Sequence, residues 1–250
     1  MSSIPQYISQ RVRRPVPEGC FVIQGSTPVI SFGDASRATV ATLGLNPSRQ
    51  EFADAKGEWL VSTARRLVTY DQLGVKALEN ASDELISLVI EGCYNYFKVN
   101  PYMRWFNDLE LILTKGTGTS YFDYSACHLD LVQWATDPVW QKLDEATRAK
   151  LIDEDKIFLK EQLKNEKIQL ILLNGRTVLN EVEKLGVKLD KKTPEILGRI
   201  NCDIYVGTDE GTAYIGWSTN LQSSFGVTNQ FKQALAERVK REMILSGTTL

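Results

Sequence analysis

Apolar and polar residues follow two patterns along the chain, and each pattern predicts a different element. Continuous apolar runs predict buried strands, most clearly at 38–43 and 168–173, with further strands expected at 121–131, 202–206 and 212–217. Apolar residues at helical spacing predict amphipathic helices over 59–67, 84–96 and 105–113. A long charged helix is expected over 145–165, and further helices from about 177 and over about 228–242. Because strands and helices alternate, we expect an α/β fold, a three-layer αβα sandwich around a central, mostly parallel sheet.

Composition supports a single α/β domain over residues 1–250, because the chain is 43% hydrophobic and 24% charged. No run approaches the ~18 apolar residues of a membrane span. The four cysteines are widely scattered, which suits a reducing compartment and predicts a cytoplasmic protein without a metal site. We also expect a monomer without a cofactor. A net charge of -2 excludes a generally basic nucleic-acid coat, so any contact with DNA must be local.

Two charged segments lie outside the predicted core. Residues 11–14, in an N-terminal arm of about residues 1–20, carry three arginines and are expected to be a solvated tail or, alternatively, a phosphate contact. The acidic run at 153–155 is expected to be a solvated helix face.

A polar motif, Gly44-Leu45-Asn46-Pro47-Ser48, directly follows the first apolar run. Ligands of open α/β sheets bind at the carboxyl ends of parallel strands. Gly44 allows the backbone to approach a ligand, and Pro47 keeps Asn46 out of helical geometry. The motif therefore predicts that Asn46 is a fixed hydrogen-bonding group at a ligand site, the alternative being an ordinary turn.

Two further strand ends carry polar residues: His128-Leu129-Asp130-Leu131 and the segment 218–223. In order and spacing, these three motifs resemble those of the uracil-DNA glycosylase superfamily, over about residues 38–242. The resemblance implies a monofunctional DNA glycosylase, which flips a pyrimidine nucleotide into a pocket and hydrolyses its N-glycosidic bond to leave an abasic site. Asn46 then occupies the place of the residue that orients the attacking water.

The resemblance also implies which base is excised. Asp130 stands where the family has a base-reading Asn, and a carboxyl group matches cytosine, because it accepts from N4 and, when protonated, donates to N3. Ser48 replaces a Tyr that blocks the C5 edge in the fastest uracil-specific branch, which opens room for a C5 substituent. Prokaryotic proteins resembling the superfamily include antiviral glycosylases acting on glucosylated hydroxymethylcytosine in phage DNA. The alternatives are that Asp130 caps a turn and Ser48 caps a helix.

Other residues receive roles from the same resemblance. Trp59, or as second choice Phe52, is expected to stack on the flipped base, and His128 to contact the base or serve structurally. Leu221 is expected to be the apolar wedge that fills the vacated space, or a hydrophobic staple to the core. Trp217 replaces the usual histidine of the late loop. The expected DNA contacts are Ser218, Asn220, Gln222, Ser223, Asn174 and Arg176.

The sequence is also compatible with three alternative functions. A uracil or thymine mispair glycosylase is compatible with Asn46 and Ser48 but not favoured by Asp130. A catalytically inactive module that binds modified DNA is suggested by the replaced histidine. A pocket for a small nucleotide metabolite would follow if the resemblance were accidental.

Overall fold

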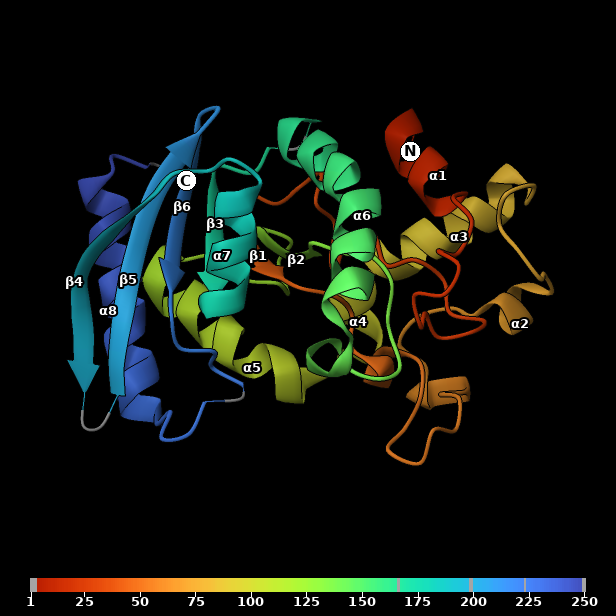
Figure 1. Cartoon of the computed structure of the whole chain (residues 1–250), viewed down its shortest axis with the longest axis horizontal. Helices are drawn as coiled ribbons and strands as arrows, with labels where there is room; N and C mark the ends of the chain where they lie inside the picture. Colours follow the sequence, from red (N-terminus) through yellow and green to blue (C-terminus); the bar gives the residue numbers. More distant parts are fainter. Residues whose placement is uncertain (1–3, 166, 198–199, 223, 249–250) are drawn as a thin grey trace. The chain divides into compact units, whose positions relative to one another are not determined.

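The computed structural model describes residues 4–165, 167–197, 200–222 and 224–248 (Figure 1). The chain forms two compact units, each built from three segments. The unit called here the helical unit comprises Met1–Asp34, Leu45–Tyr102 and Leu129–Asn165. The sheet unit comprises Ala35–Gly44, Met103–His128 and Glu166–Leu250.

The sheet has six strands in the order β2-β1-β3-β6-β5-β4. Their bounds are β1 Val40–Gly44, β2 Ala126–Asp130, β3 Leu170–Asn174, β4 Leu189–Leu197, β5 Ile200–Asp209 and β6 Thr212–Trp217. Strands β1, β3 and β6 run parallel, whereas β5 is antiparallel to β6 and β4 to β5. The α/β class with a largely parallel sheet is confirmed, as are the five expected strands. The sequence did not predict β4, because that strand is largely polar.

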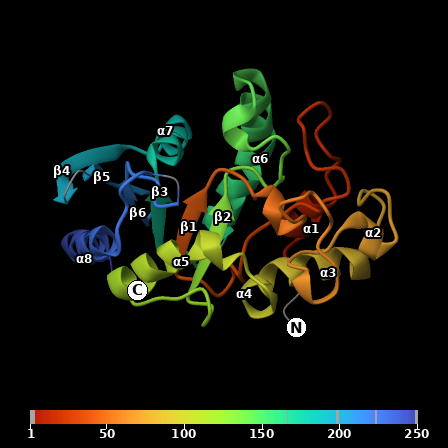
Figure 2. The same cartoon turned by 90° about the horizontal axis from the view of Figure 1, so that it is seen from below.

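Helices cover both faces of the sheet within the sheet unit. They are α5 Met103–Ile112, the adjoining η3 Leu113–Thr117, α7 Arg176–Lys184 and α8 Asn229–Leu245. Figure 2 shows α7 on one face and α5 with α8 on the other. A Cβ atom at Gly216 in β6 would lie 2.5 Å from a methyl carbon of Leu179, so a glycine is needed for α7 to pack this closely.

The helical unit contains α1 Gln6–Val12, η1 Arg49–Glu51, η2 Ser62–Ala64, α2 Tyr70–Leu73, α3 Asp83–Tyr94, α4 Tyr96–Val99, η4 Trp140–Lys142 and α6 Glu145–Asn165. The helices expected near 84–96 and 145–165 are confirmed. The helix expected at 59–67 is wrong, since only the short η2 forms there. Trp59 and Val61 are exposed, so the stretch has no continuous buried face to support a helix.

The N-terminal arm is not a solvated tail, because α1 packs against α3 and α6 within the helical unit. Arg11 is fully buried, and its Nη2 lies 2.9 Å from both carboxylate oxygens of Asp155. Asp155 is 2% exposed, which corrects the expectation of a solvated acidic run at that position. These two charges are 144 residues apart and become buried together because each neutralises the other.

The buried ion pair continues into a hydrogen-bond network at the end of β2. Arg11 Nε donates to Gln133 Oε1 at 3.2 Å, and the Gln133 backbone N–H donates to Asp155 at 2.8 Å. The Gln133 side-chain amide in turn donates to the carbonyl oxygen of Asp130 at 2.8 Å. The network therefore fixes the segment that follows β2.

Replacing Arg11 with Met is expected to lower the free energy of unfolding by about 3–5 kcal/mol, because it leaves Asp155 as an uncompensated buried charge. Urea denaturation measures the change. The control is Lys156→Met, which breaks the exposed α6 pair between Lys156 and Asp153 and should cost less than about 1 kcal/mol. Equal small losses in both variants would contradict the assignment.

Candidate functional site

Asn46 follows the end of β1 by two residues and belongs to the helical unit. The Asn46 amide nitrogen donates to the backbone oxygen of Trp134 at 3.1 Å and to Thr136 Oγ1 at 3.2 Å. A backbone carbonyl only accepts hydrogen bonds, so the atom facing Trp134 must be nitrogen. Asn46 Oδ1 is thereby oriented as an acceptor, which suits a group that positions a water molecule.

Asp130 lies beside this motif in the same unit. It is the last residue of β2, the strand next to β1, and is only 5% exposed. The Val132 N–H donates to the Leu45 carbonyl oxygen at 2.9 Å, which ties the segment after Asp130 to the segment before Asn46. The structure therefore brings together the two chain segments that carry Asn46 and Asp130.

Three more predicted residues lie close behind Asn46 in sequence. Ser48 caps η1, where its Oγ accepts from the Gln50 N–H at 3.2 Å, so the helix-capping alternative is observed. Phe52 is 1% exposed and belongs to the core, whereas Trp59 is 42% exposed. The two rings meet edge to face with centroids 6.5 Å apart. Of this pair, Trp59 is the one with a surface available for stacking on a base.

Glu51 is a residue of this site that the sequence analysis missed. It is 2% exposed, and its Oε2 accepts from the Tyr96 hydroxyl at 2.6 Å. Burial raises the pKa of Glu51 to about 7; the Tyr96 hydrogen bond and the charge of Arg66 lower this pKa, and the charge of Asp130 raises it. A carboxyl group with a pKa near neutrality is typical of functional sites. Its burial depends on Tyr96, 45 residues away, so no local sequence pattern reveals it.

His128 lies in the buried interior of the sheet unit. It is 2% exposed, and its Nδ1 lies 2.7 Å from Thr42 Oγ1, which itself lies 2.5 Å from the Tyr121 hydroxyl. The Phe106 ring packs edge to face against the imidazole at 5.4 Å. These contacts favour the structural role over base contact.

Asn174, at the end of β3, holds the late loop of the sheet unit. Its Oδ1 accepts from Trp217 Nε1 at 2.9 Å and from the Leu221 N–H at 3.1 Å, and its Nδ2 donates to Gln222 Oε1 at 2.6 Å. Its side chain therefore positions the loop instead of facing outward to DNA. Leu221 is 3% exposed, which favours the core staple over the wedge.

The other predicted DNA contacts also lie in the sheet unit. Arg176 is half exposed but paired with Asp203 at 2.6 Å, and Ser218 Oγ accepts from the Asp203 N–H at 2.9 Å. Asn220 packs so close to Gly175 that a Cβ there would lie 3.2 Å from it; the φ of Gly175, +100°, also favours glycine. Ser223 lies outside the described residues.

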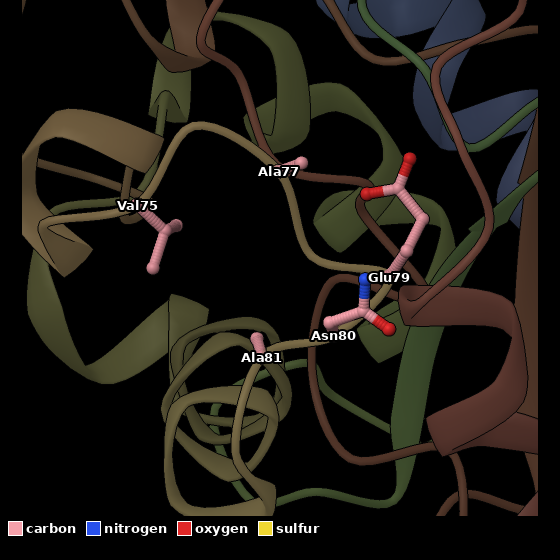
Figure 3. A pocket seen from close by; sticks show the side chains of 5 residues that line it. All are labelled: Val75, Ala77, Glu79, Asn80 and Ala81. Carbon is pink, nitrogen blue, oxygen red and sulfur yellow. The ribbon is translucent and has the colours of Figure 1, made fainter.

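A separate hollow of about 500 Å³ lies in the helical unit, on the loop between α2 and α3 (Figure 3). Its lining consists of Val75, Ala77, Glu79, Asn80 and Ala81 and includes no predicted site residue. Within the described residues, no cluster of three or more His, Cys, Asp or Glu is arranged to hold a metal. Every helix in those same ranges is too short or too polar to span a membrane.

The chain matches no protein-family model and no curated protein. The case for a function therefore rests on the geometry of the site.

Glu51→Gln is expected to change how stability depends on pH. A carboxyl pKa raised on folding stabilises the protein fully at low pH, and that contribution is lost as the pH rises from about 4.5 to about 7. Relative to the wild type, the variant should therefore gain about 2–3 kcal/mol between pH 5 and pH 8. Urea unfolding at both pH values measures this gain, and a constant difference would contradict the raised pKa.

Leu221→Ala is expected to lower the free energy of unfolding by about 2–5 kcal/mol, because it leaves a cavity in the core. Phe225→Ala, in the same loop, is the control. Phe225 is 96% exposed, so its replacement should change stability by less than about 0.5 kcal/mol. Thermal or urea unfolding of both variants tests the placement, which fails if Leu221→Ala is as mild as the control.

Proposed function

We propose that this protein is a monofunctional DNA glycosylase that excises a C5-substituted cytosine, such as glucosylated hydroxymethylcytosine in phage DNA. The observation that carries the proposal is the position of two polar residues at neighbouring strands. Asn46 follows the end of β1, and Asp130 ends β2. One is a doubly anchored amide with an oriented oxygen, and the other is a buried carboxyl group. The proposed enzyme acts on DNA as a cytoplasmic monomer without a metal or cofactor.

In the proposed reaction, Asn46 Oδ1 accepts a hydrogen bond from a water molecule and directs its oxygen at C1′ of the flipped nucleotide. The C1′–N1 bond breaks, the base leaves with the bonding electrons, and the water oxygen bonds to C1′. The water molecule releases its proton to solvent, because an amide is too weakly basic to accept it. The departing nucleobase takes up a proton from solvent. Asn46 therefore contributes orientation, and stabilisation of the charge on the leaving base must come from the rest of the pocket.

Base choice is assigned to Asp130. A carboxyl group accepts from N4 of cytosine and, when protonated, donates to N3, whereas uracil presents the reverse pattern at these positions. Ser48 leaves room beside C5, and the exposed ring of Trp59 provides a stacking surface. Ser218, Asn220, Gln222 and Arg176 are proposed to contact phosphates, and the wedge role is not assigned to the buried Leu221.

The test is excision from matched duplexes that carry uracil, thymine opposite guanine, cytosine, hydroxymethylcytosine or glucosylated hydroxymethylcytosine, with alkali cleavage to reveal abasic sites. The wild type should act on the modified cytosines. Asn46→Ala should lose about 100-fold or more of the rate, since the water is no longer positioned. The matched control is Asn95→Ala, an exposed asparagine of the same unit, which should retain activity.

Asp130→Asn gives a sharper test of base reading. An amide at this position can donate to O4 of uracil and accept from its N3–H, so preference should move from modified cytosine toward uracil. The ratio of kcat/KM for the two substrates measures this change. Excision of uracil by the wild type would instead support mismatch repair and contradict the assigned role of Asp130.

One observation favours a second candidate, an inactive module that binds modified DNA. Trp217 replaces the loop histidine of the resembled family and is fully buried, so no imidazole is available there to stabilise the leaving base. Tight binding of modified duplexes without any abasic product would support this candidate over the enzyme.

A further inference from the structure

A cluster of charged side chains lies on one face of the sheet, within the sheet unit. Tyr205 in β5 is paired with Lys191 in β4 and with Gly216 in β6, so these three residues share a face. A Cβ atom at Gly216 would meet Leu179 of α7, which identifies this face as the one that α7 covers (Figure 2). Lys191 therefore lies on the same side of the sheet as α7.

One carboxylate on this face holds two cations. Asp203 in β5 accepts from Arg176 Nη2 at 2.6 Å through one oxygen, and its other oxygen lies 2.9 Å from Lys191 Nζ. Arg176 also donates to the Tyr205 hydroxyl, and its guanidinium carbon lies 5.1 Å from the centroid of that ring. The hydrogen bonds from Lys191 and Arg176 lower the pKa of Asp203, so the carboxylate is charged at neutral pH. This Asp203 cluster of Arg176, Lys191, Asp203 and Tyr205 therefore carries one net positive charge.

The exposed side of the Asp203 cluster consists of hydrogen-bond donors. The Arg176 and Lys191 side chains are 46% and 56% exposed, whereas the Asp203 side chain is 19% exposed. Within the described residues, the guanidinium gives one hydrogen bond to Tyr205 and one to Asp203, out of five N–H donors. The Lys191 ammonium group has three donors. Both cations therefore keep N–H groups that can bind a ligand while they hold Asp203.

Backbone hydrogen bonds fix the positions of Arg176 and Asp203 through Ser218. The Ser218 N–H donates to the Asp203 carbonyl oxygen at 2.9 Å, and the Arg176 N–H donates to the Ser218 carbonyl oxygen at 3.2 Å. Ser218 Oγ accepts from the Asp203 N–H at 2.9 Å, and a hydroxyl oxygen that accepts can still donate its own proton to a ligand. Groups that are positioned before binding lose less conformational freedom when a ligand arrives.

The charge of the Asp203 cluster matches a single anion. A structural ion pair needs one cation for one carboxylate, whereas Lys191 and Arg176 are two cations that repel each other. Asp190 and Lys192, the neighbours of Lys191, point to the opposite face and lie 3.9 Å apart, so they do not neutralise the cluster. A phosphodiester group carries one negative charge and has two unesterified oxygens, so it can accept from both cations.

We propose that Arg176 and Lys191, both held by Asp203, bind one phosphodiester group of the DNA backbone between them. The inference rests on the proposed function, which supplies DNA as the partner, and deepens it. Arg176 and Lys191 donate to the two unesterified oxygens, and the Ser218 hydroxyl donates to the same group. The chain has a net charge of -2, so such a local positive cluster is what contact with DNA requires. The contact adds affinity without reading sequence, because every phosphate is alike.

The salt dependence of DNA binding tests the phosphate contact without any need for excision. Binding of the full chain to an unmodified, fluorescein-labelled duplex is followed by anisotropy between about 50 and 200 mM salt. In Lys191→Gln, the slope of log K against log salt should become shallower by about one, because one phosphate contact is lost. The control is Lys184→Gln, which removes another exposed, carboxylate-paired cation of the sheet unit and should leave the slope unchanged. Equal slopes in the wild type and Lys191→Gln would overturn the inference.

A double variant tests whether the two cations share one phosphate. The Asp203 cluster has a net charge of one, so loss of either cation neutralises it. Arg176→Gln combined with Lys191→Gln should therefore lower the affinity further but make the slope no shallower than Lys191→Gln alone. Lys191→Arg keeps the charge and should keep the wild-type slope. A slope that is shallower by about two in the double variant would indicate two separate phosphates and overturn the shared contact.

Free phosphate is the other ligand with this chemistry, and ³¹P NMR of inorganic phosphate distinguishes it from DNA. Binding of inorganic phosphate that depends on Lys191, together with a DNA slope that does not, would overturn the assignment to the DNA backbone. Failure of the wild type to bind the duplex at the lowest salt would overturn it as well.

The two proposals fail in different ways. If the wild type excises no base while Lys191→Gln makes the slope shallower, the glycosylase function fails and the phosphate contact stands. If modified cytosine is excised while the slope is identical in Lys191→Gln, the function stands and the phosphate contact fails.

Discussion

The buried ion pair between Arg11 and Asp155 is the interaction on which the candidate site depends. Through Gln133 it fixes both the Asp130 carbonyl and the segment whose Trp134 carbonyl anchors Asn46. The Arg11 guanidinium also lies 5.0 Å from the centroid of the Trp134 ring. A buried ion pair often adds little net stability, since desolvation offsets the attraction between the charges. Here the ion pair determines geometry, because it holds the segment around Gln133 in one hydrogen-bonded arrangement.

The sequence was sufficient where one local pattern determined the structure. The buried strands β1 and β3 follow from continuous apolar runs, and α6 was expected as a long charged helix. The closeness of Asn46 and Asp130 was also predictable in outline, because the ends of neighbouring strands meet at one edge of a sheet. These features need only local patterns and general rules of α/β topology.

Features that depend on a distant partner were not predictable. Arg11 and Asp155 are ordinary charges in sequence, and nothing local indicates that each buries the other. Glu51 is likewise hidden, since its burial depends on Tyr96. Leu221 shows the converse, because a polar loop suggested exposure while Asn174 holds its backbone against the core. The edge strand β4 was not predicted, because its sequence is largely polar and its strand structure depends on hydrogen bonding to β5.

Under the proposed function, most of the discrimination between cytosine and uracil would come from a carboxyl group. In the proposed enzyme, the anchored amide of Asn46 would orient water equally well for any flipped pyrimidine, so it would not distinguish cytosine from uracil. Shape also distinguishes them weakly, because the two bases differ at one exocyclic group and one ring proton. A buried carboxyl group separates them strongly, since a wrong pattern leaves buried donors or acceptors unpaired. The proposed enzyme would therefore recognise its base through the buried Asp130 carboxyl group and not through Asn46.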